Sequence, residues 1–174
     1  PGSFWQAHVK GPELLTSCVS EFAKLLNLDP EKQNLDLYSG AGLFSATLSA
    51  QFDGAKFLAV ESSKQAIADG ERSPHDLDNL RFHQADVLKF LRSQTAGTFD
   101  TIILDPPRSG AANKVVEQLI RLSPRNMIYV ACDPVALARD LKTLGDAGYK
   151  VKAMRAFDIF PHTHHFETVV ALAR

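Results

Sequence analysis

A chain of 174 residues with 45% hydrophobic content is long enough to bury the core of one globular domain. Its formal net charge is -1 and its basic residues are scattered singly, which argues against a basic tail or stripe that grips a phosphate backbone unaided. The two cysteines, Cys18 and Cys132, lie far apart, which argues against a disulfide framework, a zinc site or an iron–sulfur cluster and favours a reducing compartment.

The N-terminal residues Pro1–Phe4 have neither the basic start nor the apolar middle of a signal peptide, and no run of about 18 apolar residues follows. We therefore expect a soluble, cytoplasmic protein without a membrane segment. Because the chain begins at proline, we also expect a fragment or a processed chain. After Pro12, apolar residues recur at helical spacing, which predicts an opening helix that ends near Asn27.

Between Asn34 and Ala131, short apolar runs alternate with helix-length segments. This pattern is typical of repeated βαβ units, in which each helix brings the chain back to start the next parallel strand. The predicted strands are Asn34–Tyr38, Phe57–Glu61, Leu80–Ala85, Phe99–Leu104 and Met127–Ala131. The predicted helices are Leu43–Gln51, Lys64–Arg72, Val87–Arg92, Lys114–Leu122 and Val135–Asp146.

Two further strands are predicted at Lys150–Phe157 and Phe166–Ala173. The loop Asp158–His165 between them is too short for a helical crossover, so it must return the chain antiparallel. We therefore expect one α/β domain over residues 1–174, with a Rossmann-like, seven-stranded, mostly parallel sheet whose last strand is antiparallel.

The turn after the first predicted strand, Asp36–Gly42, carries two glycines and precedes a helix. In open α/β sheets, ligands bind beyond the carboxyl ends of the strands. Gly40 and Gly42 permit positive φ and let a ligand approach bare backbone, and the helix N-terminus behind them offers N–H groups. Asp36 is a candidate to orient this loop or to hold an ammonium group through a water. A tight strand-to-helix turn without a ligand would also explain the glycine spacing.

Acidic residues end the next three predicted strands. Glu61 is placed to accept both ribose hydroxyls of a nucleoside, or else to cap the next helix. Asp86 could reach an adenine amino group, or act only as the N-cap of the helix that begins at Val87. Asp105 begins the motif Asp105-Pro106-Pro107-Arg108, in which two prolines hold the chain extended and leave the carboxylate little freedom.

A thiol and a second carboxylate are predicted at the same end of the sheet. Cys132 ends the fifth strand and neighbours Asp105 if the strands follow the common order, although a free cysteine is as typical of a packed core. Glu167 lies at the start of the last strand, which begins at the ligand face. Cys18, in contrast, lies on the apolar face of the opening helix and is predicted to be core.

The order of these motifs resembles the catalytic domain of the RNA 5-methyluridine methyltransferases, which methylate carbon 5 of uridine in tRNA and rRNA. The resemblance covers nearly the whole chain and implies a class I methyltransferase that binds S-adenosylmethionine (SAM). The matching pieces are Phe4-Trp5-Gln6, Asp36–Gly42, Val60-Glu61, Asp105–Arg108, Cys132-Asp133-Pro134, Phe157–His162 and His164–Thr168. The residues that the resemblance implies to contact the methyl donor or its surroundings are Gln6, Tyr38, Glu61 and Asp105.

The same resemblance implies that Cys132 is the nucleophile and Glu167 the general base. Addition of the thiolate to carbon 6 would make carbon 5 an enolate that accepts the methyl group, after which the carboxylate removes the proton of carbon 5. The chain departs from the family pattern at Ser39, Ala131 and Asp133, where cysteine, serine and asparagine are common. Asp133 adds a negative charge that opposes thiolate formation unless it is turned away or paired.

Family members also carry an N-terminal RNA-binding β-barrel and an intervening region, whereas this chain begins at the Gln6 motif. We therefore expect tRNA or rRNA as the substrate, with RNA binding that needs those N-terminal regions. No metal is expected, because His162, His164 and His165 lack a further ligand cluster and adjacent residues of a strand point to opposite faces.

Three other functions remain open. A nicotinamide-dependent oxidoreductase would use the same sheet, but the third glycine of its fingerprint is absent. A methyltransferase acting on another nucleobase atom or a small molecule is the second, although Arg108 stands where an aromatic residue suits an exocyclic amino group. The third is a donor-binding module without turnover, against which the intact pair Cys132 and Glu167 argues.

Overall fold

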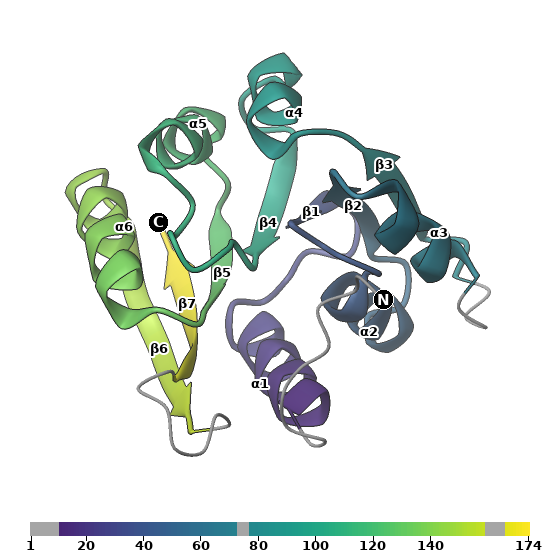
Figure 1. The fold of residues 1–174 in the computed structure, drawn as a ribbon, viewed down its shortest axis with the longest axis horizontal. Coiled ribbons are helices and arrows are strands. Elements are labelled where there is room, and N and C mark those ends of the chain that lie inside the picture. The colour runs from purple at the N-terminus through teal and green to yellow at the C-terminus, as the bar shows by residue number, and fades with distance from the viewer. Residues whose placement is uncertain (1–10, 73–76, 159–165) are drawn as a thin grey trace.

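The computed structural model describes residues 11–72, 77–158 and 166–174 of the chain. Within them, helices pack on both faces of a single seven-stranded sheet (Figure 1). The strands are β1 Gln33–Leu37, β2 Lys56–Glu61, β3 Leu80–Gln84, β4 Phe99–Leu104, β5 Asn126–Ala131, β6 Lys150–Phe157 and β7 Glu167–Ala173. The helices are α1 Gly11–Leu25, α2 Leu43–Gln51, α3 Lys64–Glu71, α4 Val87–Ser93, α5 Asn113–Leu122 and α6 Pro134–Asp146.

The sequence-based prediction of these elements is confirmed. From β1 onward each observed boundary lies within one residue of the predicted one, and α1 ends at Leu25 instead of near Asn27. The first strand stops at Leu37 because Tyr38 turns to a left-handed backbone conformation with a φ of 60°. The turn between β1 and α2 therefore begins at Tyr38, one residue earlier than the predicted end of the strand.

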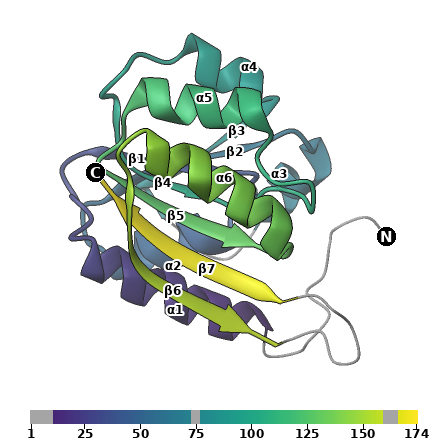
Figure 2. The same cartoon turned by 90° about the vertical axis from the view of Figure 1, so that its left-hand side faces the viewer.

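The strand order is β3-β2-β1-β4-β5-β7-β6. β1 to β5 pair in parallel, whereas β7 is antiparallel to both β5 and β6, which confirms the reversed last strand. The sequence did not predict that β7 would lie between β5 and β6. Figure 2 shows this arrangement, with β7 inside the sheet and β6 at its edge.

The sheet is covered on both faces. α1 and α2 lie on one face, and α4, α5 and α6 lie on the other (Figure 2). The buried side chains of these helices form one hydrophobic cluster with the sheet on each face. Every residue of β4 and of β5 is buried, as expected for central strands of a parallel sheet that is covered on both sides. Cys18 is 1% exposed in the α1 core, so its predicted core position is confirmed.

An ion pair between the buried Asp100 and the half-exposed Arg125 lies at the end of the sheet where the parallel strands begin. Asp100, at the start of β4, accepts hydrogen bonds from Arg125 at its two carboxylate oxygens, at 2.8 and 2.9 Å. It also accepts from the backbone N–H of Asp29 and from the hydroxyl of Thr101. Arg125 donates as well to the carbonyl of Asn27, at 2.7 Å. These bonds tie the connection between α1 and β1 to the two central strands.

We predict that Arg125→Ala destabilises the fold by about 1–3 kcal/mol at pH 7, because it leaves a buried carboxylate without its cation. Burial raises the pKa of Asp100, but the hydrogen bonds from Arg125, Asp29 and Thr101 outweigh it and hold the pKa below its usual value. The stability of the ionised pair is therefore present at neutral pH and is lost as the pH falls through that lowered pKa. Urea unfolding at pH 7 and below about pH 4 should show the difference between wild type and variant shrinking with acid; an equal difference at both pH values contradicts the assignment.

Candidate active site

The turn between β1 and α2 has a strained backbone. Tyr38, Gly40 and Gly42 have φ angles of 60°, 55° and 81°, which glycine adopts freely and tyrosine does not. A hydrogen bond of 2.8 Å from the N–H of Gly42 to the carbonyl of Ser39 closes the turn. A Cβ atom added to Gly40 would meet nothing within 4 Å, so open space adjoins the backbone there, as a ligand site requires.

Asp36 caps the helix that follows this turn. The N-cap residue of α2 is Gly42, which has no side chain to cap with. The carboxylate of Asp36 accepts the N–H of Ser45, the third residue of α2, at 3.0 Å and replaces the missing cap. Its other oxygen is buried and has no partner among the described residues. Burial raises the pKa of Asp36 to about 7, against the opposing hydrogen bonds from Ser45. The structure thus gives Asp36 a helix-capping contact, and its predicted roles toward the loop and an ammonium group stay predictions.

Two glycines, Gly42 and Gly70, allow β3 and α3 to pack closely against this turn. A Cβ atom on Gly42 would lie 2.7 Å from the ring of Phe82 in β3. A Cβ atom on Gly70, in α3, would lie 2.6 Å from both the carbonyl oxygen of Ala41 and the same ring. Sequence reasoning missed Gly70 because a single helical glycine carries no motif.

Glu61 and Asp86 are held in backbone hydrogen bonds. Glu61 accepts the N–H of Gly40 at 3.1 Å with one oxygen and the N–H of Ser63 at 2.7 Å with the other, so it joins the glycine turn to the start of α3. Asp86 accepts the N–H of Lys89 at 2.9 Å, which is the N-cap geometry of the alternative interpretation. Their predicted contacts with a nucleoside stay predictions.

The structure brings Asp105, Cys132 and Glu167 together. Asp105 and Cys132 follow the ends of β4 and β5, which are neighbouring parallel strands. In the antiparallel ladder of β5 and β7, Ala131 lies opposite Thr168, so the next residues along the two strands, Cys132 and Glu167, are adjacent. Glu167 is 3% exposed and Cys132 is partly exposed. A buried carboxylate therefore lies beside an accessible thiol.

The electrostatics of this cluster favour protonated groups. Burial, and then the charges of Glu167 and Asp36, raise the pKa of Asp105 well above its usual value. Burial, Glu167 and Asp105 raise the pKa of the Cys132 thiol, and burial raises that of Glu167. Arg108 opposes the rise at both Cys132 and Glu167. This role of Arg108 was not predicted from the sequence, in which the residue stands out only as a replacement for an aromatic side chain.

The charge of Asp133 is not among the causes that raise the pKa of the Cys132 thiol, although the two residues are neighbours in the sequence. The carboxylate of Asp133 accepts the N–H of Ala136 at 2.7 Å and is the N-cap of α6. The charge is therefore paired with the positive end of the helix dipole. The pKa of Cys132 is raised by burial first, and then by the charges of Glu167 and Asp105.

Several predicted residues lie outside the described part of the chain, namely Gln6, His162, His164 and His165. Among the described residues, no group of three or more His, Cys, Asp or Glu side chains is arranged to hold a metal ion. Nor does the described part of the chain contain a helix that is long and apolar enough to cross a membrane.

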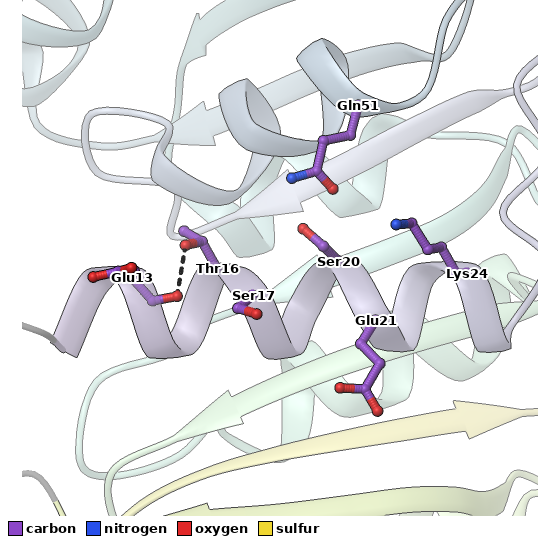
Figure 3. A pocket seen from close by; sticks show the side chains of 7 residues that line it. All are labelled: Glu13, Thr16, Ser17, Ser20, Glu21, Lys24 and Gln51. Carbon is purple, nitrogen blue, oxygen red and sulfur yellow. Dashed lines mark hydrogen bonds between the residues drawn. The ribbon is translucent and has the colours of Figure 1, made fainter.

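A separate pocket lies along α1 and the end of α2 (Figure 3). None of the residues predicted for the site lines it. Its lining residues are Glu13, Thr16, Ser17, Ser20, Glu21, Lys24 and Gln51.

Comparison with known proteins gives one consistent family. The family model described as tRNA (Uracil-5-)-methyltransferase matches residues 18–174. An uncharacterized RNA methyltransferase of Streptomyces avermitilis is 43% identical over 174 residues, which cover 98% of this chain and 39% of that protein. One from Thermotoga maritima is 44% identical over 142 residues, which cover 80% of this chain and 32% of that protein. The chain thus spans roughly two fifths or less of the length of these relatives.

Solved structures agree with this assignment. The Pyrococcus abyssi tRNA (uracil-54, C5)-methyltransferase, in complex with S-adenosyl-L-homocysteine, matches with a TM-score of 0.82 and 33% identity, over 99% of this chain and 41% of that chain. The magnesium protoporphyrin IX methyltransferase of Synechocystis, with bound SAM, matches with a TM-score of 0.69 and 19% identity, over 95% and 81% of the two chains. The second match shows the class I methyltransferase fold alone.

The raised pKa of Asp36 predicts how the stability of the fold depends on pH. The folded state holds a proton on Asp36 up to about pH 7, far above its usual pKa, so this group makes the wild type less stable as the pH rises toward 7. Asp36→Asn cannot ionise and keeps an acceptor for the N–H of Ser45. Its unfolding free energy relative to wild type should therefore improve between about pH 4 and pH 8, by on the order of 2–4 kcal/mol.

Asp100→Asn is the matched control, because the pKa of that buried aspartate is lowered. Its unfolding free energy relative to wild type should change little between pH 4 and pH 8, because this carboxylate is ionised in both the folded and the unfolded state over most of that range. The two trends are measured by denaturant unfolding at several pH values. Parallel trends for both variants would show that burial of Asp36 does not set its pKa.

Proposed function

Because the chain belongs to the tRNA (uracil-5-)-methyltransferase family, we propose that it is the catalytic core of an enzyme that transfers a methyl group from SAM to carbon 5 of a uridine in tRNA or rRNA. The observation that carries the proposal is the adjacency of Cys132, just after the end of β5, and Glu167, at the start of β7. Membership of this family removes the oxidoreductase alternative.

The glycine turn fits the methyl donor. The open space at Gly40 and the buried oxygen of Asp36 without a partner suit a ligand with a positive group. The carboxylate of Glu61, fixed by two backbone N–H groups, suits a pair of ribose hydroxyls. We assign the remaining donor contacts to Gln6, Tyr38, Gly42, Asp86 and Asp105. Bound SAM would supply an electrophilic methyl group on a sulfonium.

Cys132 activates the uracil ring. Its sulfur forms a bond to carbon 6, and the electron pair of the double bond moves onto the carbonyl of carbon 4 as an enolate. The thiol proton must leave for this step, and the carboxylates of Asp105 and Glu167 are the bases beside it. Arg108 supplies the positive charge that favours the thiolate. Carbon 5 then takes the methyl group and keeps its hydrogen.

Glu167 completes the reaction. It removes the proton from carbon 5, the double bond between carbons 5 and 6 reforms, and the bond from carbon 6 to sulfur breaks to release the thiolate. Burial raises the pKa of Glu167, which makes the ionised form a stronger base than an exposed carboxylate. Glu167 is the first residue of β7 and lies beside Cys132, which suits removal of a proton from a ring that is still bonded to the cysteine.

The substrate must be presented with its uridine out of the base stack, since the attack is on the ring. The formal charge of -1 gives this chain little electrostatic attraction for a phosphate backbone. We therefore assign RNA binding, in the cytoplasm, chiefly to the portion of the relatives that this chain does not span.

Trapping tests the covalent step. With SAM and RNA that contains 5-fluorouridine, carbon 5 of the adduct bears fluorine and no removable proton. The full-length protein that contains this chain should then form a complex that survives denaturing gel electrophoresis. Cys132→Ala should form none, and Cys18→Ala, which changes the buried cysteine, should form as much as wild type. A stable complex with Cys132→Ala, or none with wild type that binds SAM, contradicts the mechanism.

Removal of the base should separate the two halves of the reaction. Glu167→Gln should form the methylated adduct on ordinary RNA but release it about 100 to 10,000 times more slowly, because an amide does not accept the proton. Adduct and free product are measured with labelled SAM. Glu61→Gln is the control: it should weaken SAM binding without accumulation of the adduct. Release at the wild-type rate by Glu167→Gln would assign the base to another residue.

A further inference from the structure

Asp140 is a buried carboxylate on α6 outside every motif of the sequence analysis. It is 1% exposed, and both its oxygens accept hydrogen bonds. One accepts the hydroxyl of Tyr129 at 2.7 Å and the N–H of Ala111 at 2.9 Å. The other accepts two N–H groups of Arg139, at 3.0 and 2.9 Å. We call Asp140, Arg139 and Tyr129 the Asp140 clamp.

The clamp holds the loop that follows Asp105-Pro106-Pro107-Arg108. Arg139 donates to the carbonyl of Ser109 at 2.9 Å, and the N–H of Ala111 also reaches the Tyr129 oxygen at 3.1 Å. Gly110, with a φ of 80°, packs directly on these side chains. A Cβ atom there would lie 2.5 Å from Arg139 and 2.7 Å from Asp140.

Arg108 lies within the part of the loop that is fixed at both ends. The N–H of Gly110 donates to the carbonyl of Pro107 at 2.8 Å, which closes a β-turn with Arg108 at its second position. Before this turn, the N–H of Asp105 donates to the carbonyl of Leu37 in the sheet, at 3.3 Å. The backbone beneath the arginine side chain is thus held by the sheet on one side and by the clamp on the other.

The helix that carries Asp140 and Arg139 follows closely after the nucleophile in the chain. α6 begins at Pro134, two residues after Cys132, and its first turn is capped by Asp133. The same first turn meets the loop, because a Cβ atom on Gly110 would lie 3.2 Å from that of Ala136. Cys132, α6, the clamp and the turn of Arg108 therefore form one connected body.

We infer that Asp140 is a positioning residue, which fixes the turn that carries Arg108 against the helix that begins after Cys132. The inference rests on the proposed function only for the role of Cys132 as the nucleophile. Arg108 is exposed and has a long side chain, and a Coulomb attraction weakens with distance and with screening by solvent. Its effect on the thiol therefore depends on a fixed backbone, which the clamp provides.

The reactivity of the thiol measures this coupling. The rate at which iodoacetamide alkylates Cys132 is followed against pH, in the full-length protein without RNA or SAM, by mass spectrometry of the peptide that contains the residue. In Asp140→Asn, one acceptor oxygen becomes a donor, so the clamp cannot hold both Ala111 and Arg139. We expect a higher thiol pKa and alkylation about 3–10 times slower near pH 7. The other charges that face the thiol, Glu167 and Asp105, are unchanged in this variant.

Asp100→Asn is the matched control. Asp100 is likewise buried and accepts from an arginine, a backbone N–H and a hydroxyl, but it lies at the opposite end of the sheet. This variant should lose stability and leave the alkylation rate of Cys132 unchanged. Tyr129→Phe and Gly110→Ala disturb the same clamp by other means, and they keep the inference testable if Asp140→Asn does not fold.

A double variant separates positioning from general loosening. Arg108→Gln should raise the thiol pKa by itself, and Asp140→Asn added to it should slow alkylation no further. Unchanged alkylation in folded clamp variants, or slowing that adds fully to that of Arg108→Gln, overturns the inference. Because these measurements need neither SAM nor RNA, they stand apart from the trapping experiment, whose failure would instead reject the proposed methylation.

Discussion

The burial of carboxyl groups at one end of a hydrophobic sheet is the constraint around which this domain is arranged. Asp36, Asp105 and Glu167 lie at or beside the carboxyl ends of central strands, where burial raises the pKa of all three. Desolvated carboxyl groups so close together oppose one another's ionisation. The fully buried strands β4 and β5 supply the apolar packing that holds them there in spite of this cost.

The opposite end of the same sheet uses an aspartate in the opposite way. Asp100 is as deeply buried, yet the guanidinium of Arg125 and two further donors keep its pKa low. At the other end, Arg108 is exposed and is held indirectly through its backbone. An ion pair therefore compensates the buried charge where the strands begin, whereas the carboxyl groups where the strands end are only partly compensated and have raised pKa values.

Local patterns predicted the elements well, because apolar periodicity and turn residues act over a few neighbours. These local patterns could not predict that β7 lies between β5 and β6, because that position depends on pairing between strands that are distant in the chain. Among the site residues, Cys132 and Glu167 could be placed from strand ends alone. Asp140 could not, because nothing in its neighbourhood reveals that Tyr129 and Ala111 come to meet it.

The internal position of β7 bears on how the domain is made. Residues 167–173 are synthesised after β5 and β6, yet they must fill the space between those two strands. Until they leave the ribosome, β5 and β6 each present an unpaired edge, which invites wrong pairing. Glu167 enters with the same strand, so a nascent chain that already contains the glycine turn and Cys132 still lacks the buried carboxylate beside that thiol. The insertion of β7 therefore completes the sheet and the candidate site in the same folding step.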